Sequence, residues 1–251
     1  MNLLNLFRRK KKSQFYLKLY CNLHKSDYTK REKELLVMET KALSEKLFPK
    51  ALPYTYDISG PGYGISKGSP FIQEKALNNK FIKKGFKNCH GLLIRSKEGD
   101  IEISVATEPK ARKTQFINLY FNLPLESHQF TPYTESIINQ LKKIVNIEYG
   151  YGYPTLSSMN NHSENYLQRS IFGSYYKNNE VLIDWENNLG LIEEGIIQKL
   201  HHINIVNLAQ LEKLSHINFD KIITIDDGIN ILTLNDNNLK AFKNKVDNGF
   251  N

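Results

Sequence analysis

Histidine and cysteine are the residue types in this 251-residue sequence that could bind a metal ion or act as nucleophiles. A zinc protease carries H-E-x-x-H on a helix, and a structural zinc site carries paired Cys or His at fixed spacing. Neither pattern occurs, so we predict no metal site and no cofactor. One ring of the pair His201-His202 should point inward and the other outward. Cys21 and Cys89 have neither redox nor zinc spacing and are predicted to be reduced, packed thiols.

The sequence also contains no motif for catalysis by a serine or by paired carboxylates. No serine lies in a G-x-S-x-G elbow, and neither cysteine has the flanking residues of a cysteine hydrolase. An acidic cluster is interpreted as a solvated edge, because no metal or glycosidase pattern accompanies it. Its members are Glu180, Asp184, Glu186, Glu193 and Glu194. We predict no catalytic residues and a protein that is not an enzyme; an enzyme whose site assembles only in the folded chain is the third hypothesis.

The stretch Gly60-Pro-Gly-Tyr-Gly-Ile-Ser-Lys-Gly68 is the most glycine-rich in the chain and could cradle a phosphate. A dinucleotide site requires G-x-G-x-x-G and a P-loop requires G-x-x-x-x-G-K-[ST], and this stretch satisfies neither. Its Pro61 also lacks a backbone N–H group. We predict a turn leading into a helix that begins near Ser69 and Pro70, where serine suits the N-cap and proline the first helical position.

Several tyrosines occur in glycine-bearing or polar contexts, above all in Tyr149-Gly-Tyr-Gly-Tyr153. Alternation with glycine would project these three tyrosines from one face of a strand. Tyrosine and tryptophan are enriched at protein interfaces, where they offer a large, rigid surface. We predict that Tyr149, Tyr151, Tyr153 and Trp185 contact a partner. The alternative for each tyrosine is a place at the edge of the core with a hydrated hydroxyl.

The net charge of +8 is unevenly distributed. A basic run, Arg8–Lys12, carries five positive charges and belongs to a predicted tail at residues 1–13. The segment from Lys80 to Lys113 contributes a net five more, so the rest of the chain is slightly acidic. This distribution differs from that of a uniformly basic DNA-binding domain and predicts no specific nucleic-acid binding. A nucleic-acid-associated protein that uses the tail and the 80–113 surface is the alternative function.

The first residues also bear on membrane association. Their apolar part, Leu3–Phe7, is short and precedes the charges, whereas a secretory signal has positive charges before a longer apolar stretch. The sequence contains nothing near the roughly 18 consecutive apolar residues of a membrane span. We therefore predict a cytoplasmic protein with no integral membrane segment. Peripheral membrane contact by the tail is an alternative to a solubilising role.

Hydrophobic periodicity and capping residues predict an α+β fold with a mostly antiparallel sheet. The predicted strands are 15–23, 54–59, 92–95, 101–106, 116–123, 149–153, 221–225 and 229–234. The predicted helices are 29–48, one that opens at Thr131 and Pro132, 208–214 with Asn207 as N-cap, and a last one capped by Asn235 or Asp236. Residues 160–172 are predicted as polar helix or loop. The strands of 92–123 form a meander at the centre of a domain over 14–251, with a possible soft division near residue 147.

From about Ile144 onward the chain resembles the type VI secretion immunity families, which protect bacteria from polymorphic toxins. The residues that carry the resemblance are Tyr149–Tyr153, Trp185, Leu200–Leu211 with Leu214, and the hairpin Asp227–Leu232 followed by a last helix. The resemblance implies a non-enzymatic protein with a compact α+β fold that binds and blocks a cognate effector. We therefore predict a bacterial immunity protein that occludes a secreted toxin in a one-to-one complex. Because the chain is basic, complementarity favours a partner with an acidic or neutral docking surface.

Overall fold

The computed structural model describes most of the chain. The described residues are 14–23, 30–60, 72–84, 89, 91–106, 117–155, 165–170, 173–178, 192, 195, 197, 200–225 and 228–247. The predicted tail at 1–13, Trp185, the five residues of the acidic cluster and most of the glycine-rich stretch lie outside these residues.

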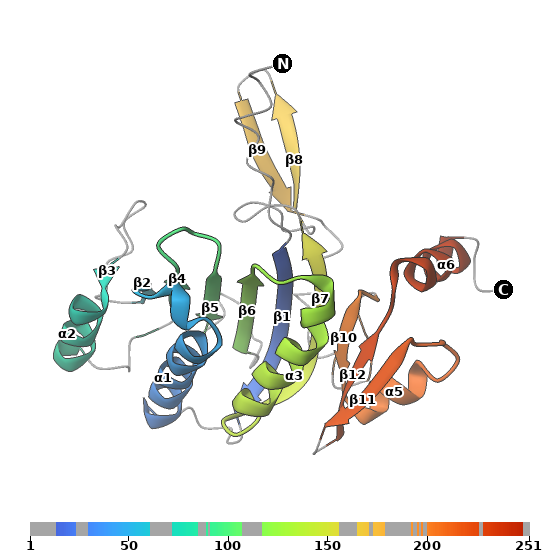
Figure 1. Ribbon diagram of the computed structural model, residues 1–251, viewed down its shortest axis with the longest axis horizontal. Helices are drawn as coiled ribbons and strands as arrows, with labels where there is room; N and C mark the ends of the chain where they lie inside the picture. Colours follow the sequence, from blue (N-terminus) through green and yellow to red (C-terminus); the bar gives the residue numbers. More distant parts are fainter. Residues whose placement is uncertain are drawn as a thin grey trace.

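One sheet of ten strands and a separate two-stranded hairpin make up the β structure (Figure 1). The sheet contains β1 (Gln14–Leu23), β2 (Thr55–Ser59), β3 (Ile72–Gln73), β4 (Gly91–Arg95), β5 (Glu102–Ala106), β6 (Ile117–Leu123), β7 (Val145–Thr155), β10 (Ile203–Val206), β11 (Lys221–Ile225) and β12 (Ile229–Thr233). The hairpin consists of β8 (Asn165–Ser170) and β9 (Gly173–Asn178). The α-helices are α1 (Lys30–Leu47), α2 (Glu74–Lys84), α3 (Phe130–Leu141), α5 (Leu208–Lys213) and α6 (Asp236–Asp247), and the short 3-10 helices are η2 (Pro49–Ala51) and η4 (Ser127–Gln129).

The strand pairs of the sheet are antiparallel, in the order β11-β12-β10-β7-β1-β6-β5-β4-β2-β3. This confirms the α+β prediction, and β4, β5 and β6 form the predicted meander. The two middle strands of the sheet are β1 and β6. Of the three meander strands, only β6 is one of the two middle strands, whereas β5 and β4 lie towards the β3 edge, so the meander as a whole is not centred. β1 and its other neighbour, β7, are the two longest strands, with 10 and 11 residues. Alternation along a strand indicates which residues share a face, but it does not indicate how distant strands pair.

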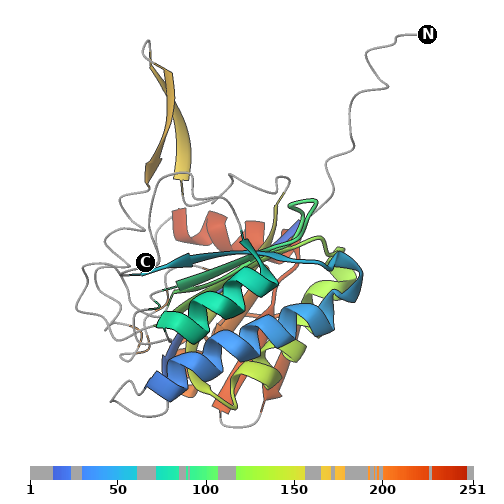
Figure 2. The same cartoon turned by 90° about the vertical axis from the view of Figure 1, so that its left-hand side faces the viewer.

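The two sides of the sheet differ in chemistry, because alternate residues of a strand point to opposite sides. One side, here called the apolar face, packs into the main core and carries Phe15, Leu17 and Leu19 from β1. The opposite side, here called the tyrosine face, carries Tyr16, Lys18 and Tyr20. Figure 2 shows α1, α2 and α3 on one side of the sheet and α6 on the other.

Two glycines of β7, Gly150 and Gly152, allow β1 and β7 to pack closely on the apolar face. A Cβ atom on Gly150 would lie 2.7 Å from Leu19 Cδ2 and 2.8 Å from a backbone carbonyl oxygen of β1. A Cβ atom on Gly152 would lie 2.5 Å from the ring of Phe15. That ring stacks on Phe130 of α3, with centroids 4.3 Å apart. Side chains of β1 therefore fill the space that β7 leaves open.

Two helix starts follow the capping residues in the sequence. Asn207 Oδ1 accepts a hydrogen bond from the backbone N–H of Gln210, and Gln210 Oε1 accepts one from the N–H of Asn207, each at 3.0 Å. This reciprocal capping box opens α5. Asn235 Oδ1 accepts a bond from the N–H of Asn238 at 2.9 Å, so Asn235 is the cap of α6.

Two other predicted elements differ from the structure. The helix predicted to begin near Ser69 and Pro70 begins at Glu74, directly after β3. The short strand β3 pairs with β2 at the edge of the sheet, a non-local pairing that cap signals do not encode. The stretch 160–172, predicted as helix or loop, contains β8, which pairs with β9. This hairpin forms a sheet of its own, separate from the main sheet.

We predict that the change Gly150→Ala lowers the free energy of unfolding by about 2 kcal/mol, the cost of overpacking a core site. The new methyl group would meet both a side chain and a backbone carbonyl, and the carbonyl belongs to the central strand and cannot give way cheaply. Urea unfolding followed by fluorescence measures the change. Asn146→Ala, at an exposed position of the same strand, is the matched control and should change stability by less than about 0.5 kcal/mol. Equal effects of the two changes would contradict the close-packing argument.

Candidate functional site

The predicted contact tyrosines lie together at the centre of the tyrosine face. Antiparallel pairing sets Tyr149 opposite Tyr20, and Tyr153 opposite Tyr16. The ring centroids of Tyr149 and Tyr151 are 6.0 Å apart, and those of Tyr151 and Tyr153 are 6.3 Å apart. The prediction that these three tyrosines share one face of a strand is confirmed.

Their exposure is low, however. Tyr149, Tyr151 and Tyr153 are 1%, 0% and 7% exposed, and Ile192 packs into the same cluster. The ring of His201 stacks on Tyr151 with centroids 4.4 Å apart. Direct contact between these tyrosines and a partner would require their cover to move, so their role in binding stays a prediction. Trp185, the fourth predicted contact residue, lies outside the described part.

The tyrosine face also carries charged side chains. The Nζ atom of Lys18, a residue only 8% exposed, lies 5.2 Å from the centre of the Tyr20 ring, a cation–π distance. On the meander, Glu102 accepts hydrogen bonds from Arg95 at 2.7 and 3.1 Å and from the hydroxyl of Tyr120 at 3.2 Å. Burial, followed by the Glu102 carboxylate, raises the pKa of Tyr120. This hydroxyl therefore acts as a hydrogen-bond donor at neutral pH and not as a base.

The histidine and cysteine predictions can be compared with their positions. His201 is buried against the tyrosines, whereas Nε2 of the partly exposed His202 lies 2.8 Å from Asp236 Oδ1, so one ring points inward and the other outward as predicted. Cys21 and Cys89 are both buried, and no disulfide joins them. Burial raises the pKa of the Cys21 thiol, which makes it inert as a nucleophile. In the described ranges, no group of three or more His, Cys, Asp or Glu side chains is placed to hold a metal ion.

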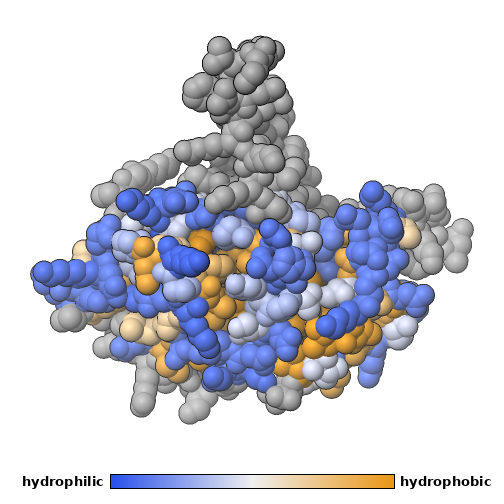
Figure 3. Space-filling model, in the orientation of Figure 1, coloured by the Kyte–Doolittle hydropathy of each residue, from blue (hydrophilic) through white to orange (hydrophobic). Residues whose placement is uncertain are grey.

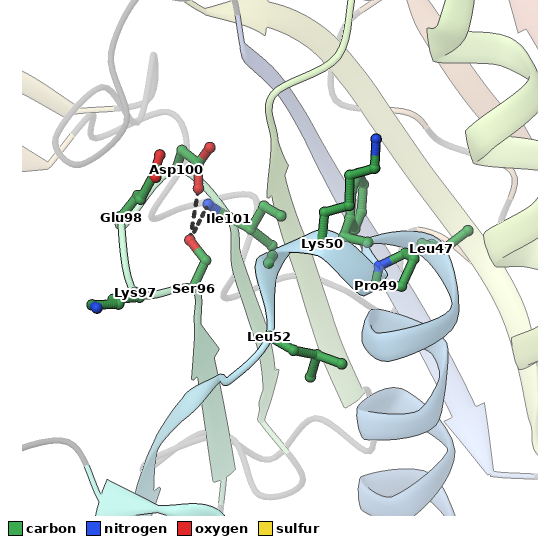
Figure 4. A pocket seen from close by; sticks show the side chains of 11 residues that line it. Leu47, Pro49, Lys50, Leu52, Ser96, Lys97, Glu98, Asp100 and Ile101 are labelled. Carbon is green, nitrogen blue, oxygen red and sulfur yellow. Dashed lines mark hydrogen bonds between the residues drawn. The ribbon is translucent and has the colours of Figure 1, made fainter.

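An apolar hollow of about 470 Å³ lies on the other side of the sheet, between the end of α1 and the β4–β5 turn. We call it the α1–hairpin pocket. Its apolar walls come from Leu47, Phe48, Pro49, Ala51, Leu52 and Ile101. Figure 4 shows Leu52 and Ile101 between the helix end and the hairpin, with Lys50 and Lys97 directed outward at the rim. Leu52 is 49% exposed, which is high for a large apolar side chain.

Hydrogen bonds hold both walls of this pocket. The hydroxyl of Tyr54 shares its proton between the carbonyl oxygens of Ser44, at 3.0 Å, and Phe48, at 3.1 Å, and so fixes the end of α1. The hydroxyl of Ser96 donates to Asp100 Oδ1 at 2.7 Å and accepts from the N–H of Ile101 at 3.1 Å, which closes the β4–β5 turn. The pocket is therefore preformed.

Sequence reasoning did not find the α1–hairpin pocket. Its two walls lie almost fifty residues apart in the sequence. Local patterns predict one wall as a helix end and the other as a hairpin turn, with no link between them. The apolar Leu52, beside Pro53 and outside any helix or strand, was the signal available. Periodicity assigns such a residue to no face, so it predicts no contact for it.

Comparison with known proteins gives a likeness to solved structures but no family. No protein-family model matches the chain, and no curated protein matches it. Among solved structures, the Pseudomonas aeruginosa T6SS protein PA0821 is similar with a TM-score of 0.46 and 10% sequence identity. The similarity covers 88% of this chain and 65% of that one, so this chain spans slightly less than two thirds of the length of PA0821.

In the described part of the chain, no helix is long and apolar enough to cross a membrane.

Tyr54 and Tyr151 are both buried, but only the Tyr54 hydroxyl has hydrogen-bond partners among the described residues, so the pair tests what those bonds contribute to stability. Tyr54→Phe removes a hydroxyl that binds two carbonyl oxygens and should lower the free energy of unfolding by about 1 kcal/mol or more. Tyr151→Phe should leave it nearly unchanged, because the Tyr151 hydroxyl is buried and has no hydrogen-bond partner among the described residues. Urea unfolding measures both changes. A loss for Tyr151→Phe as large as that for Tyr54→Phe would show that this hydroxyl is bonded.

Proposed function

We propose that this protein is a non-enzymatic immunity protein that binds a cognate secreted toxin and neutralises it by occlusion. The observation that carries the proposal is the α1–hairpin pocket, a preformed apolar hollow at the surface with a charged rim. Protein interfaces have this anatomy: an apolar anchor of one partner fills a pocket of the other, and a polar rim surrounds it.

The surroundings of the pocket suit a protein ligand. Figure 3 shows hydrophobic residues reaching the surface on this face among hydrophilic ones. Leu35 and Met38, on the adjoining helix α1, are 44% and 46% exposed. An anchor side chain of the toxin would cover Leu52. The charged side chains of the pocket are Lys50, Lys97, Glu98 and Asp100, so they would meet polar groups of either sign beside the anchor.

The resemblance to immunity proteins supplies the nature of the partner. The sequence segments that carry it fold side by side, because β7, β10 and β12 are neighbours in the sheet. Tyr151 pairs with Asn204, and Asn204 pairs with Leu232. These three segments thus form one structural block, which is consistent with a shared origin for the resemblance.

The direct test is co-expression with the secreted effector encoded beside this protein, followed by pull-down, measurement of stoichiometry and a growth assay. The proposal predicts a one-to-one complex and growth that depends on this protein. Cell death despite abundant folded protein, together with failure to recover a complex, would show that the immunity function is wrong.

The affinity for the same toxin tests whether the pocket belongs to the binding surface. Leu52→Asp places a charge among apolar walls and should weaken toxin binding by about thirtyfold, the effect of losing a central anchor contact. Leu208→Asp, at a 59% exposed leucine of α5 that does not line the pocket, is the matched control and should change affinity by less than about twofold. Calorimetric titration measures both affinities. Equal affinities of the two variants would show that the pocket is not part of the binding surface. The immunity function itself would not be contradicted.

A further inference from the structure

A second hollow, of about 680 Å³, lies between the start of α3, the end of β7 and the start of α6. We call it the acidic groove. Its carboxylates are Glu126, Asp220 and Asp236, and its apolar floor includes Phe130, Ile203 and Leu234. Among the described residues, no lysine or arginine lines it. The groove is thus a locally acidic surface on a chain with a net charge of +8.

The carboxylates are fixed in place but remain accessible. Asp220 accepts hydrogen bonds from the side-chain amides of Asn235 and Asn238, at 2.6 and 2.8 Å. The side chains of Glu126 and Asp236 are 79% and 78% exposed. In the described part of the chain, the basic side chains beside these carboxylates are His128 at 3.6 Å from Glu126, His202 at 2.8 Å from Asp236, and Lys240, which acts on Asp236 through space. Three carboxylates and one histidine, His202, are the ionisable side chains among the described residues that line the groove, so acidic groups dominate the lining.

We propose that the acidic groove is the docking site for the basic run Arg8–Lys12 of the same chain. The run itself lies outside the described residues, so the assignment depends on the groove and on where β1 begins. Phe15 contacts two lining residues: its ring stacks on Phe130 at 4.3 Å, and its backbone pairs with Pro154. Lys12 is three residues before Phe15, a span of about 10 Å even when extended. The last residue of the basic run is therefore only three residues from Phe15, which contacts the groove.

Charge and shape both favour this occupant. The run carries five positive charges, more than enough to neutralise the three carboxylates. Lysine and arginine have long methylene stems that cover apolar surface while the charged head reaches a rim. The apolar floor with carboxylates around it matches such side chains. Short tethering to β1 also raises the effective concentration of the run at the groove, so weak individual contacts suffice. This inference does not depend on the proposed immunity function.

Trypsin, which cleaves after lysine and arginine, reports docking in the full-length protein. Intact-mass measurement follows the rate at which residues 1–12 are lost. The double variant Glu126→Gln and Asp236→Asn should raise that rate by about fivefold, the size expected for losing two exposed ion pairs. The matched control, Glu34→Gln with Glu212→Gln, removes two exposed carboxylates elsewhere and should not change the rate. Equal rates in the wild type and the groove variant would overturn the proposal.

Two further measurements identify the occupant and exclude general unfolding. The thermal midpoint of the groove variant and its cleavage rate at internal sites should match those of the wild type, because both substituted side chains are exposed. Protection of residues 1–12 should be independent of protein concentration over about a hundredfold range, as expected for an intramolecular contact. Protection that rises with concentration, together with a dimer in sedimentation, would overturn the intramolecular assignment in favour of a second copy.

Discussion

The pairing of β1 with β7 is the constraint on which the rest of the structure depends. β1 comes from the start of the chain and β7 from its middle, and their ladder joins β6 on one side to β10 on the other. The ladder is possible because Gly150 and Gly152 leave room on the apolar face for Leu19 and Phe15. The same alternation places tyrosines on the opposite face. The alternation of tyrosine and glycine in residues 149–153 therefore sets the packing on both sides of the sheet.

The two hollows follow from where β1 begins. Gln14, its first residue, donates a side-chain hydrogen bond to the carbonyl oxygen of Asp100 in the β4–β5 turn, at 3.3 Å. Phe15, the next residue, stacks on Phe130 at the start of α3. The first bond ties β1 to a wall of the α1–hairpin pocket, and the stacking ties it to the floor of the acidic groove. Two surface features of different chemistry thus flank the same end of the central strand.

The two features differ in their charged groups. The α1–hairpin pocket has apolar walls, two lysines and two carboxylates, which suits an apolar anchor surrounded by polar groups. The acidic groove suits a basic segment, and the chain supplies one immediately before β1. Docking there would keep the most basic run of the chain from non-specific contact with nucleic acid or membrane surfaces. The tyrosine face contributes interior packing on the side of the sheet opposite the α1–hairpin pocket.

Local patterns in the sequence determined the antiparallel meander, the caps of α5 and α6 and the common face of Tyr149, Tyr151 and Tyr153, because alternation and capping depend on residues close together in the chain. They did not determine that β1 would pair with β7, that the tyrosines would be buried, or that Leu52 would line a pocket with Ile101. Each of these depends on which distant segments meet. Pairing is selected by the fit of whole faces, such as the glycines of β7 against the large side chains of β1, and that fit exists only in the folded chain.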